Sequence, residues 1–207
     1  MATFNDYLDE CRPGVHSAPD AAILSALRRA AQRFCRDSRI WRERLEDIVY
    51  VPAVNEYDLP APDGATVEEI LWARSSGNVL STCSAEAIFT AGETVEGTPQ
   101  AVALKSLSNT CLVWPTPEGG SGTLGLYVVL APSRTANEVP DQLADRWHDA
   151  IIAGARAELM STIGMPWSNP QEAERQTMIF WDFVAEARRE ATSGRHAELR
   201  IAPHRFL

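Results

Sequence analysis

The sequence predicts an α+β fold: a helical bundle of one N-terminal and two C-terminal long helices, with an inserted antiparallel β region, either a sheet or a small sandwich. Apolar residues recur every three or four positions toward both ends of the chain, whereas the middle holds short segments rich in Val, Ile, Leu and Tyr between turn residues. Helices and strands do not alternate along the chain. A doubly wound parallel sheet is therefore excluded.

The 207 residues, of which 45% are hydrophobic, allow a sizeable core and exclude full disorder. We expect a helical bundle domain formed by residues 1–45 together with 133–194. An inserted β domain covers 46–132, and an extended C-terminal tail covers 195–207.

The first long helix is expected in the run of residues 17–44. Ser17 can cap it and Pro19 suits its first turn. Its predicted buried face consists of Ile23, Leu27, Ala30, Ala31, Phe34, Ser38 and Trp41. A short helix before it is expected to stop at Pro13 and Gly14.

Seven strands are expected in the middle of the chain, separated most clearly by the turn-rich segments 60–64 and 115–122. They are Asp47–Val51, Asn55–Leu59, Thr66–Ala73, Ala87–Thr90, Ala101–Leu107, Thr110–Trp114 and Thr123–Ala131. The last of them is apolar on both faces, which predicts a central position.

Two helices are expected after Pro132. The first begins near Pro140, is closed by Gly164 and Pro166, and has an apolar stripe formed by Leu143, Trp147, Ile151, Ala155 and Leu159. The second begins at Asn169, with Glu172 three residues after this cap, and ends at Gly194. Its inner face is predicted to consist of Ala173, Phe180, Val184, Ala187 and Ala191.

The net charge of −9 is concentrated in the middle of the chain. Residues 46–138 hold 3 basic against 12 acidic residues, whereas residues 1–45 hold 8 against 6 and residues 139–207 hold 8 against 10. Of the 19 basic residues, 18 are Arg and only Lys105 is Lys. This distribution argues against a classical DNA-binding domain, which needs a basic face for phosphate contacts.

The sequence predicts no enzyme, and no catalytic, cofactor or metal site. The four cysteines form no CxxC pair and are expected to be reduced and mostly buried, and there is no HExxH or GxSxG motif. His148 is interpreted as a surface or interface residue. Glu68 and Glu69 are adjacent on a predicted strand, so they are expected to point to opposite faces and not to work as a pair.

Four stretches, in this order, resemble the phage head-to-tail adaptors, the tail tubular protein A-like proteins of short-tailed bacteriophages. They cover most of residues 17–194, and the resemblance lies in their order and spacing. The stretches are DAAILSALRRAAQRFCRDSRIWRE (20–43), VNEYDLPAPDGATVEEILWA (54–73), GTPQAVALKSLSNTCLVWPTPEG with LYVVLAPSRTANEVPDQL (97–119 and 126–143), and AIIAGARAELMSTIGMPWSNPQEAERQTMIFWDFVAEA (150–187).

The resemblance implies a structural virion protein of the neck, at the head–tail junction, that assembles in the host cytoplasm. Similar proteins form a ring, typically of twelve copies, under the portal protein and link it to the tail nozzle or tail tube protein. DNA passes through the central channel without sequence-specific binding. Neither a cofactor nor a membrane is implied.

Three sets of residues are candidates for these contacts. The resemblance implies portal binding by the helical part and the tail, and in the tail by Arg195, Leu199, Arg200, Ile201, Arg205, Phe206 and Leu207. Small residues and arginines on helices, together with a loop tryptophan, suggest a subunit interface formed by Arg28, Arg36, Ala153, Gly154, Ala157 and Trp167. Acidic residues that would line the channel and repel DNA, or would only solubilise the β region, are Glu68, Glu93, Glu96 and Glu118.

Alternatives remain open at this point. Another neck component, such as a stopper or tail-completion protein, is the nearest one. A small enzyme would need a buried, charge-lined pocket. A nucleic-acid-binding module would use the arginines between Arg28 and Arg44, which the overall charge opposes. Trp167 either staples its loop or anchors an interface.

Overall fold

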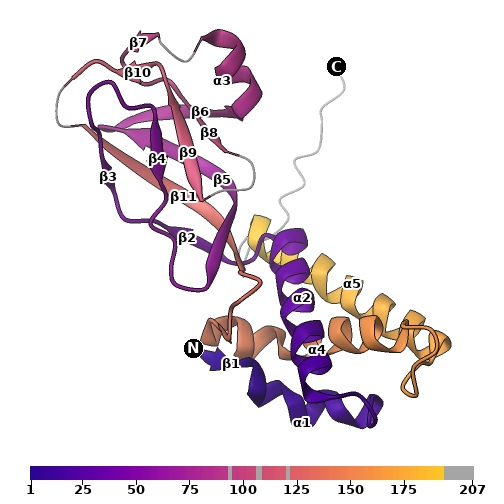
Figure 1. Ribbon diagram of the computed structural model, residues 1–207. Coiled ribbons are helices and arrows are strands. Elements are labelled where there is room, and N and C mark those ends of the chain that lie inside the picture. Colours follow the sequence, from indigo (N-terminus) through magenta and orange to yellow (C-terminus); the bar gives the residue numbers. More distant parts are fainter. Residues whose placement is uncertain (93–94, 106–108, 120–121, 194–207) are drawn as a thin grey trace, which may run out of the picture.

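The computed structural model describes residues 1–92, 95–105, 109–119 and 122–193 and confirms the α+β class. The helices other than α3 gather in one part of the molecule, the helical lobe, and residues 42–132 form the other, the β lobe (Figure 1). The helices are η1 (Phe4–Tyr7), α1 (Leu8–Cys11), η2 (Arg12–Gly14), α2 (Asp20–Ser38), α3 (Ala85–Ala91), α4 (Asp141–Met160) and α5 (Pro170–Ser193).

The helical lobe is held together by α4, which packs against both α2 and α5. The ring of Phe34 on α2 lies 5.5 Å from that of Trp147 on α4 and 6.2 Å from that of Phe180 on α5. The predicted inner faces of the three long helices are buried in this core, except that Ala191 is only half-buried and Trp41 lies beyond its helix. The helical period alone was sufficient to find this core.

Both ends of α2 differ from the prediction. The helix begins at Asp20 after Pro19, without a side-chain cap, so Ser17 is not the cap. It ends at Ser38 because Arg39 adopts the left-handed conformation (φ 56°). The Ser38 hydroxyl donates to the carbonyl of Phe34 at 2.6 Å and accepts from the amide of Ile40 at 3.3 Å, which closes the last turn.

The β lobe is an eight-stranded curled sheet whose strand order is β2-β11-β5-β6-β8-β9-β4, with β3 also pairing with β11. Two small two-stranded sheets, β1 with β12 and β7 with β10, lie outside it. The strands are β1 (Ala2–Thr3), β2 (Arg42–Arg44), β3 (Ile48–Val49), β4 (Glu56–Asp58), β5 (Ala65–Ser75), β6 (Asn78–Ser84), β7 (Glu96–Gly97), β8 (Ala101–Leu104), β9 (Thr110–Trp114), β10 (Thr116–Pro117), β11 (Thr123–Pro132) and β12 (Glu138–Val139).

Two features of the β lobe contradict the predictions. The expected strand Ala87–Thr90 is wrong, because these residues lie in α3. Ser84 caps this helix, since its hydroxyl accepts the backbone amide of Ala87 at 3.3 Å. The sheet is not wholly antiparallel, since β6 pairs with β8 in parallel. Strand β6 was missed because most of its side chains are polar and exposed.

Strand β11 is central, as predicted, and it connects the two cores. It pairs with β5 on one side and with β2 and β3 on the other. Leu124, Leu126, Val128 and Leu130 are buried in the β core, whereas the next residue, Ala131, is buried in the helical core. The change from one core to the other therefore falls near the end of β11.

Candidate interaction surfaces

The junction between the lobes is built from the C-terminal end of α2 and strand β5. Arg36 donates to both carboxylate oxygens of Glu68, at 2.9 and 3.0 Å, and Arg39 lies 2.9 Å from the carboxylate of Glu69. The β5–β11 register shifts at this point, pairing Val129 with Glu69 but Leu130 with Val67. The bulge re-aims Glu68, so both carboxylates reach the same helix end, and the expectation that they point apart is wrong.

Trp41 completes this junction just beyond the end of α2. Its side chain packs against residues of both the helical and the β core, and its carbonyl accepts the amide of Leu130 at 2.8 Å. The sequence predicted Trp41 on the buried face of the first long helix. Its side chain does make an apolar contact, but the residue lies in an extended segment beyond the end of α2. The two ion pairs and this indole tie the β lobe to α2.

The structure places the predicted small-residue interface inside the helical lobe. Ala153 is buried, and a methyl group added at Gly154 would lie 2.8 Å from the Phe180 ring and 3.0 Å from Ala30. The close approach that these small residues permit is therefore between helices of the same chain. Gly154 and Ala157 are only half-buried, so both also reach solvent, whereas Ala153 does not.

The other predicted interface residues also have partners within the chain. Arg28 donates to the carbonyl of Ala136 at 2.7 Å and to the side chain of Asn137 at 3.0 Å, and Arg36 is held by Glu68. Trp167 is half-buried against the helical core. This contact favours the loop-staple interpretation of Trp167, and its role at a subunit interface stays a prediction.

The four predicted channel-lining acids fall into three groups. Glu68 is paired with Arg36, so it offers little free negative charge. Glu96 and Glu118 are both exposed at the end of the β lobe farthest from the helical lobe, where β7 pairs with β10 (Figure 1). Glu93 lies outside the described residues.

The predicted portal-binding residues of the tail lie outside the described residues as well. They are Arg195, Leu199, Arg200, Ile201, Arg205, Phe206 and Leu207. The last described residue of α5, Ser193, lies near the C-terminal end of α2, at the junction of the lobes (Figure 1).

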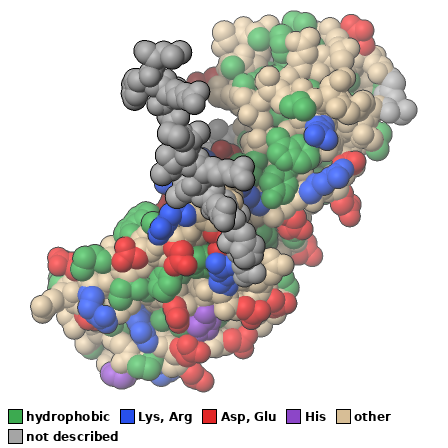
Figure 2. Space-filling view, turned by 180° about the vertical axis from the view of Figure 1, so that it is seen from behind, with side chains coloured by type: hydrophobic (Ala, Val, Ile, Leu, Met, Phe, Trp, Pro, Cys, Tyr) green, Lys and Arg blue, Asp and Glu red, His purple; other side chains and the backbone are tan. Residues whose placement is uncertain are grey.

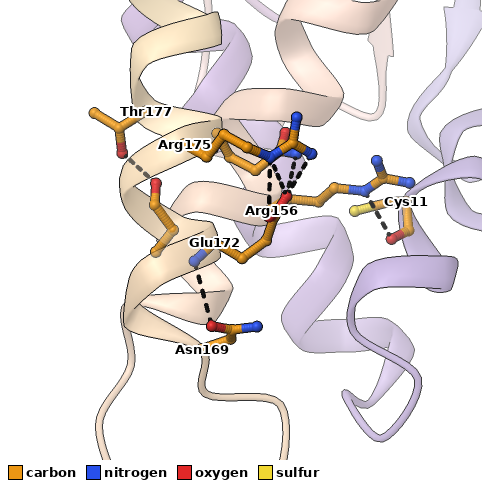
Figure 3. Close-up of polar contacts among 8 residues, drawn as sticks. Cys11, Arg156, Asn169, Glu172, Arg175 and Thr177 are labelled. Carbon is orange, nitrogen blue, oxygen red and sulfur yellow. Dashed lines mark hydrogen bonds and ion pairs between the residues drawn. The ribbon is translucent and has the colours of Figure 1, made fainter.

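A polar network fixes the opposite end of the helical lobe, where α5 begins (Figure 3). The side chain of Asn169 accepts the amide of Glu172 at 3.2 Å, as expected for the cap of α5. Arg175 donates to the carboxylate of Glu172 at 2.6 Å, and Gln176 donates to it at 2.8 Å. These hydrogen bonds, first from Arg175 and then from Gln176, lower the pKa of Glu172 to about 2. Beside it, Arg156 donates to the carbonyls of Glu10 and Cys11 and so holds the N-terminal segment.

The outer face of β2, β11 and β5 carries a surface that the sequence analysis missed. Tyr127 stands opposite Trp72 and Arg44 in the sheet, and its ring stacks on that of Trp72 with the centroids 5.7 Å apart. The guanidinium of Arg74 lies over the Trp72 ring at 5.4 Å. We call Arg44, Trp72, Arg74 and Tyr127 the arginine–aromatic wall. The signal in the sequence was Trp72 and Arg74 two positions apart on a strand, which places both side chains on one face.

The arginine–aromatic wall contains a shallow cavity of about 200 Å³. It is lined by Arg44, Trp72 and Arg74 of the wall together with Asp47 and Gly125 among others, and Asp47 lies 3.1 Å from Arg44. A methyl group at position 125 would lie 3.1 Å from the Asp47 carboxylate, so the absence of a side chain there keeps the cavity open. On this side of the molecule, Figure 2 shows hydrophobic surface on the β lobe with basic side chains next to it.

The described residues show no arrangement typical of an enzyme site. No group of three or more His, Cys, Asp or Glu side chains among them could hold a metal ion. Cys11, Cys35 and Cys111 are buried, as expected, whereas Cys83 is exposed. Burial raises the pKa of Cys11 to about 11 and that of Cys111 to about 12, and it raises that of Cys35 further. These three buried thiols are therefore protonated near neutral pH.

His148 occupies the lobe surface as expected. It stacks on Tyr7 with the ring centroids 4.3 Å apart, and its Nε2 lies 3.0 Å from the carboxylate of Glu10. Both partners belong to the N-terminal segment, so this histidine helps to hold that segment on α4. None of the helices formed by the described residues is long and apolar enough to cross a membrane.

Residues 1–205 match the sequence profile of the SU10 adaptor protein family. The chain belongs to the SU10 adaptor protein family. The match covers both lobes and the segment that follows α5. No curated protein matches the chain.

Membership of the SU10 adaptor family confirms the coarse part of the predicted function. The chain is a structural phage adaptor protein that interacts with other proteins of the phage head and tail and is located at the virion neck. An adaptor family of this kind is structural and generally non-enzymatic. The narrower resemblance to tail tubular protein A-like proteins stays a prediction.

Proposed function

We propose that this SU10 adaptor forms a ring under the portal, with twelve copies expected, and joins the portal to the next tail component while DNA passes through its centre. The observation that carries the proposal is the family match over residues 1–205. The tie between the lobes, made by Arg36–Glu68, Arg39–Glu69 and Trp41, supports it, because a connector needs two contact regions held in a defined geometry.

The proposed orientation places the helical lobe and the tail on the portal. The arginines of residues 195–207 and their terminal Phe206 and Leu207 suit a segment that binds a partner by charge and apolar anchors. The β lobe would then face the channel or the tail. Of the predicted acids, Glu96 and Glu118 remain in this proposal, since both are exposed and Glu68 is paired with Arg36. Free carboxylates at the channel would repel DNA phosphates and so reduce sticking.

The experiment is mass photometry of the full-length chain mixed with purified portal. We expect a stoichiometric complex with several adaptor copies per portal. Absence of any such complex over a range of concentrations would reject the adaptor ring. Binding to purified tail component but not to portal would instead favour a stopper or tail-completion protein. A control gel shift with DNA is expected to show no salt-sensitive binding.

A further inference from the structure

Two outer walls of the β lobe differ in chemistry and face away from each other. On one wall, Ala73, Leu126 and Val128 point into the β core, so their neighbours Trp72, Arg74 and Tyr127 point outward. On the other wall, Val102 and Val113 point into the same core, while Ala103 and Leu112 pack outward against Ile88 of α3. The arginine–aromatic wall and α3 therefore lie on opposite sides of one curled sheet.

Helix α3 presents an acidic and apolar surface to solvent. Glu86 and Phe89 are three positions apart, hence on one face of the helix, and both are exposed. Phe89 is 47% exposed, whereas Ile88 beside it is 2% exposed. No ion pair of the Glu86 carboxylate is found within the described part of the chain. We call Glu86 and Phe89 the α3 face.

The arginine–aromatic wall offers complementary chemistry. Arg44 is paired with Asp47, whereas Arg74 has no carboxylate partner within the described residues and is positioned by the Trp72 ring. Such a guanidinium retains N–H donors for a carboxylate. The cavity beside it, about 200 Å³ in volume, is lined in part by the Trp72 ring. Trp, Tyr and Arg are also the residues most enriched at the energetic centres of protein interfaces.

We propose that the arginine–aromatic wall of one copy binds the α3 face of the next copy, with Glu86 on Arg74 and Phe89 against Trp72 and Tyr127. The inference rests on the proposed function, since it names the surfaces through which the ring closes. Complementary patches on opposite sides of one subunit make a head-to-tail contact. Repetition of that contact gives a closed ring when the rotation between copies closes.

Charge reversal tests this pairing in the full-length chain. In Arg74→Glu both the arginine–aromatic wall and the α3 face are acidic, and in Glu86→Arg both are basic. Because like charges would then meet, each variant alone is expected to bind its own copies at least tenfold more weakly than wild type. Mixing the two variants in equal amounts restores both contacts, because each basic surface then meets an acidic one in an alternating ring. The double variant Arg74→Glu, Glu86→Arg is expected to assemble by itself.

Matched controls are Arg134→Glu and Glu174→Arg, at exposed positions outside both surfaces. Circular dichroism checks that each variant is folded. Assembly is measured in two ways: by mass photometry with portal, and by sedimentation of the adaptor alone at low ionic strength. Loss of assembly in each single variant, with recovery in the mixture, supports the pairing.

Two results overturn the inference without touching the proposed function. The first is that Arg74→Glu or Glu86→Arg alone still forms normal rings on the portal. The second is that mixing the two variants does not restore ring assembly. If wild type forms no complex with portal, the proposed function fails, and sedimentation then decides the pairing. A chain that stays monomeric at every concentration at low ionic strength would overturn it.

Discussion

Gly154 shows how much a single position contributes to the helical lobe. We expect Gly154→Ala to destabilise the protein, because the added methyl group would lie 2.8 Å from the Phe180 ring and 3.0 Å from Ala30. Overpacking of this kind costs about 1–3 kcal/mol. The better helix propensity of Ala returns about 1 kcal/mol, so the net loss is between about 0 and 2 kcal/mol.

Urea unfolding followed by tryptophan fluorescence measures this loss. The matched control is Gly119→Ala, since nothing lies within 4 Å of a methyl group added there, and we expect it to leave the unfolding midpoint unchanged. An unaltered midpoint for Gly154→Ala would mean that moving α2 and α5 away from α4 costs no more than the helix-propensity gain of Ala, which contradicts the tight packing described above.

The residue scale is also where sequence reasoning failed most often. Ala153 and Gly154 were expected at a subunit interface because small residues permit close helix contact, which is correct. The sequence could not say whose helix approaches, and the answer is α2 and α5 of the same chain. Likewise, Arg36 and Glu68 are 32 positions apart, and only the fold brings them together. The bulge that re-aims Glu68 leaves no mark in the strand pattern.

At the scale of elements, the first turn of α5 predicts a pH effect. The pKa of Glu172 is lowered from its ordinary value of 4.5 to about 2 by the hydrogen bonds from Arg175 and Gln176. The ionised carboxylate is thus favoured in the folded state. Its contribution to stability is complete above pH 4.5 and is lost as the pH falls toward 2.

Carbon-detected NMR titration of the Glu172 carboxyl group measures this midpoint directly. Arg175→Gln is expected to move it upward toward the ordinary value, and Arg134→Gln, at an exposed position outside this network, serves as the control that leaves it unchanged. A Glu172 midpoint near 4.5 in the wild-type protein would contradict the network in Figure 3.

Among the elements, the long helices and β9 were predictable, whereas α3 and β6 were not. Periodicity found α4 and α5 because each buries a continuous stripe in one core. Strand β6 has exposed polar side chains, so it lacks the alternation that reveals a strand. The segment Ala85–Ala91 combines Ala and Glu, which favour helices, with Ile88 and Phe89, which suggested a strand. The serine cap at Ser84 was the signal that could have decided between them.

At the scale of the whole molecule, the tail is expected to serve binding and not folding. Deletion of residues 195–207 should leave the unfolding midpoint within error of wild type, because among the described residues neither core extends beyond Ala187. It should weaken portal binding at least tenfold if the tail anchors the adaptor. Biolayer interferometry on immobilised portal measures the affinity, and thermal unfolding supplies the stability control.

Two results of the tail deletion would contradict this prediction. Unchanged affinity after the deletion would assign portal binding to the described part of the chain, the helical lobe in the first place. A large loss of stability would mean that the tail belongs to one of the cores.

The fold class and the acidic character of the β region could be predicted from the sequence at the scale of the whole molecule, since both depend on long stretches of sequence. The binding partners of individual surfaces could not be predicted, because they depend on which residues the fold brings together.

The pairing of β2 with β11 has a consequence for how this protein could vary. The chain enters the β lobe at Arg42 and leaves it after Pro132, and these two strands are neighbours in the sheet, with Arg42 opposite Val129. The two strands through which the chain enters and leaves the lobe thus run side by side, about one strand spacing, roughly 5 Å, apart. Loops inside the lobe can lengthen, shorten or be exchanged without pulling α2 and α4 apart. The β lobe can therefore diverge among related chains while the packing of the helical lobe stays the same.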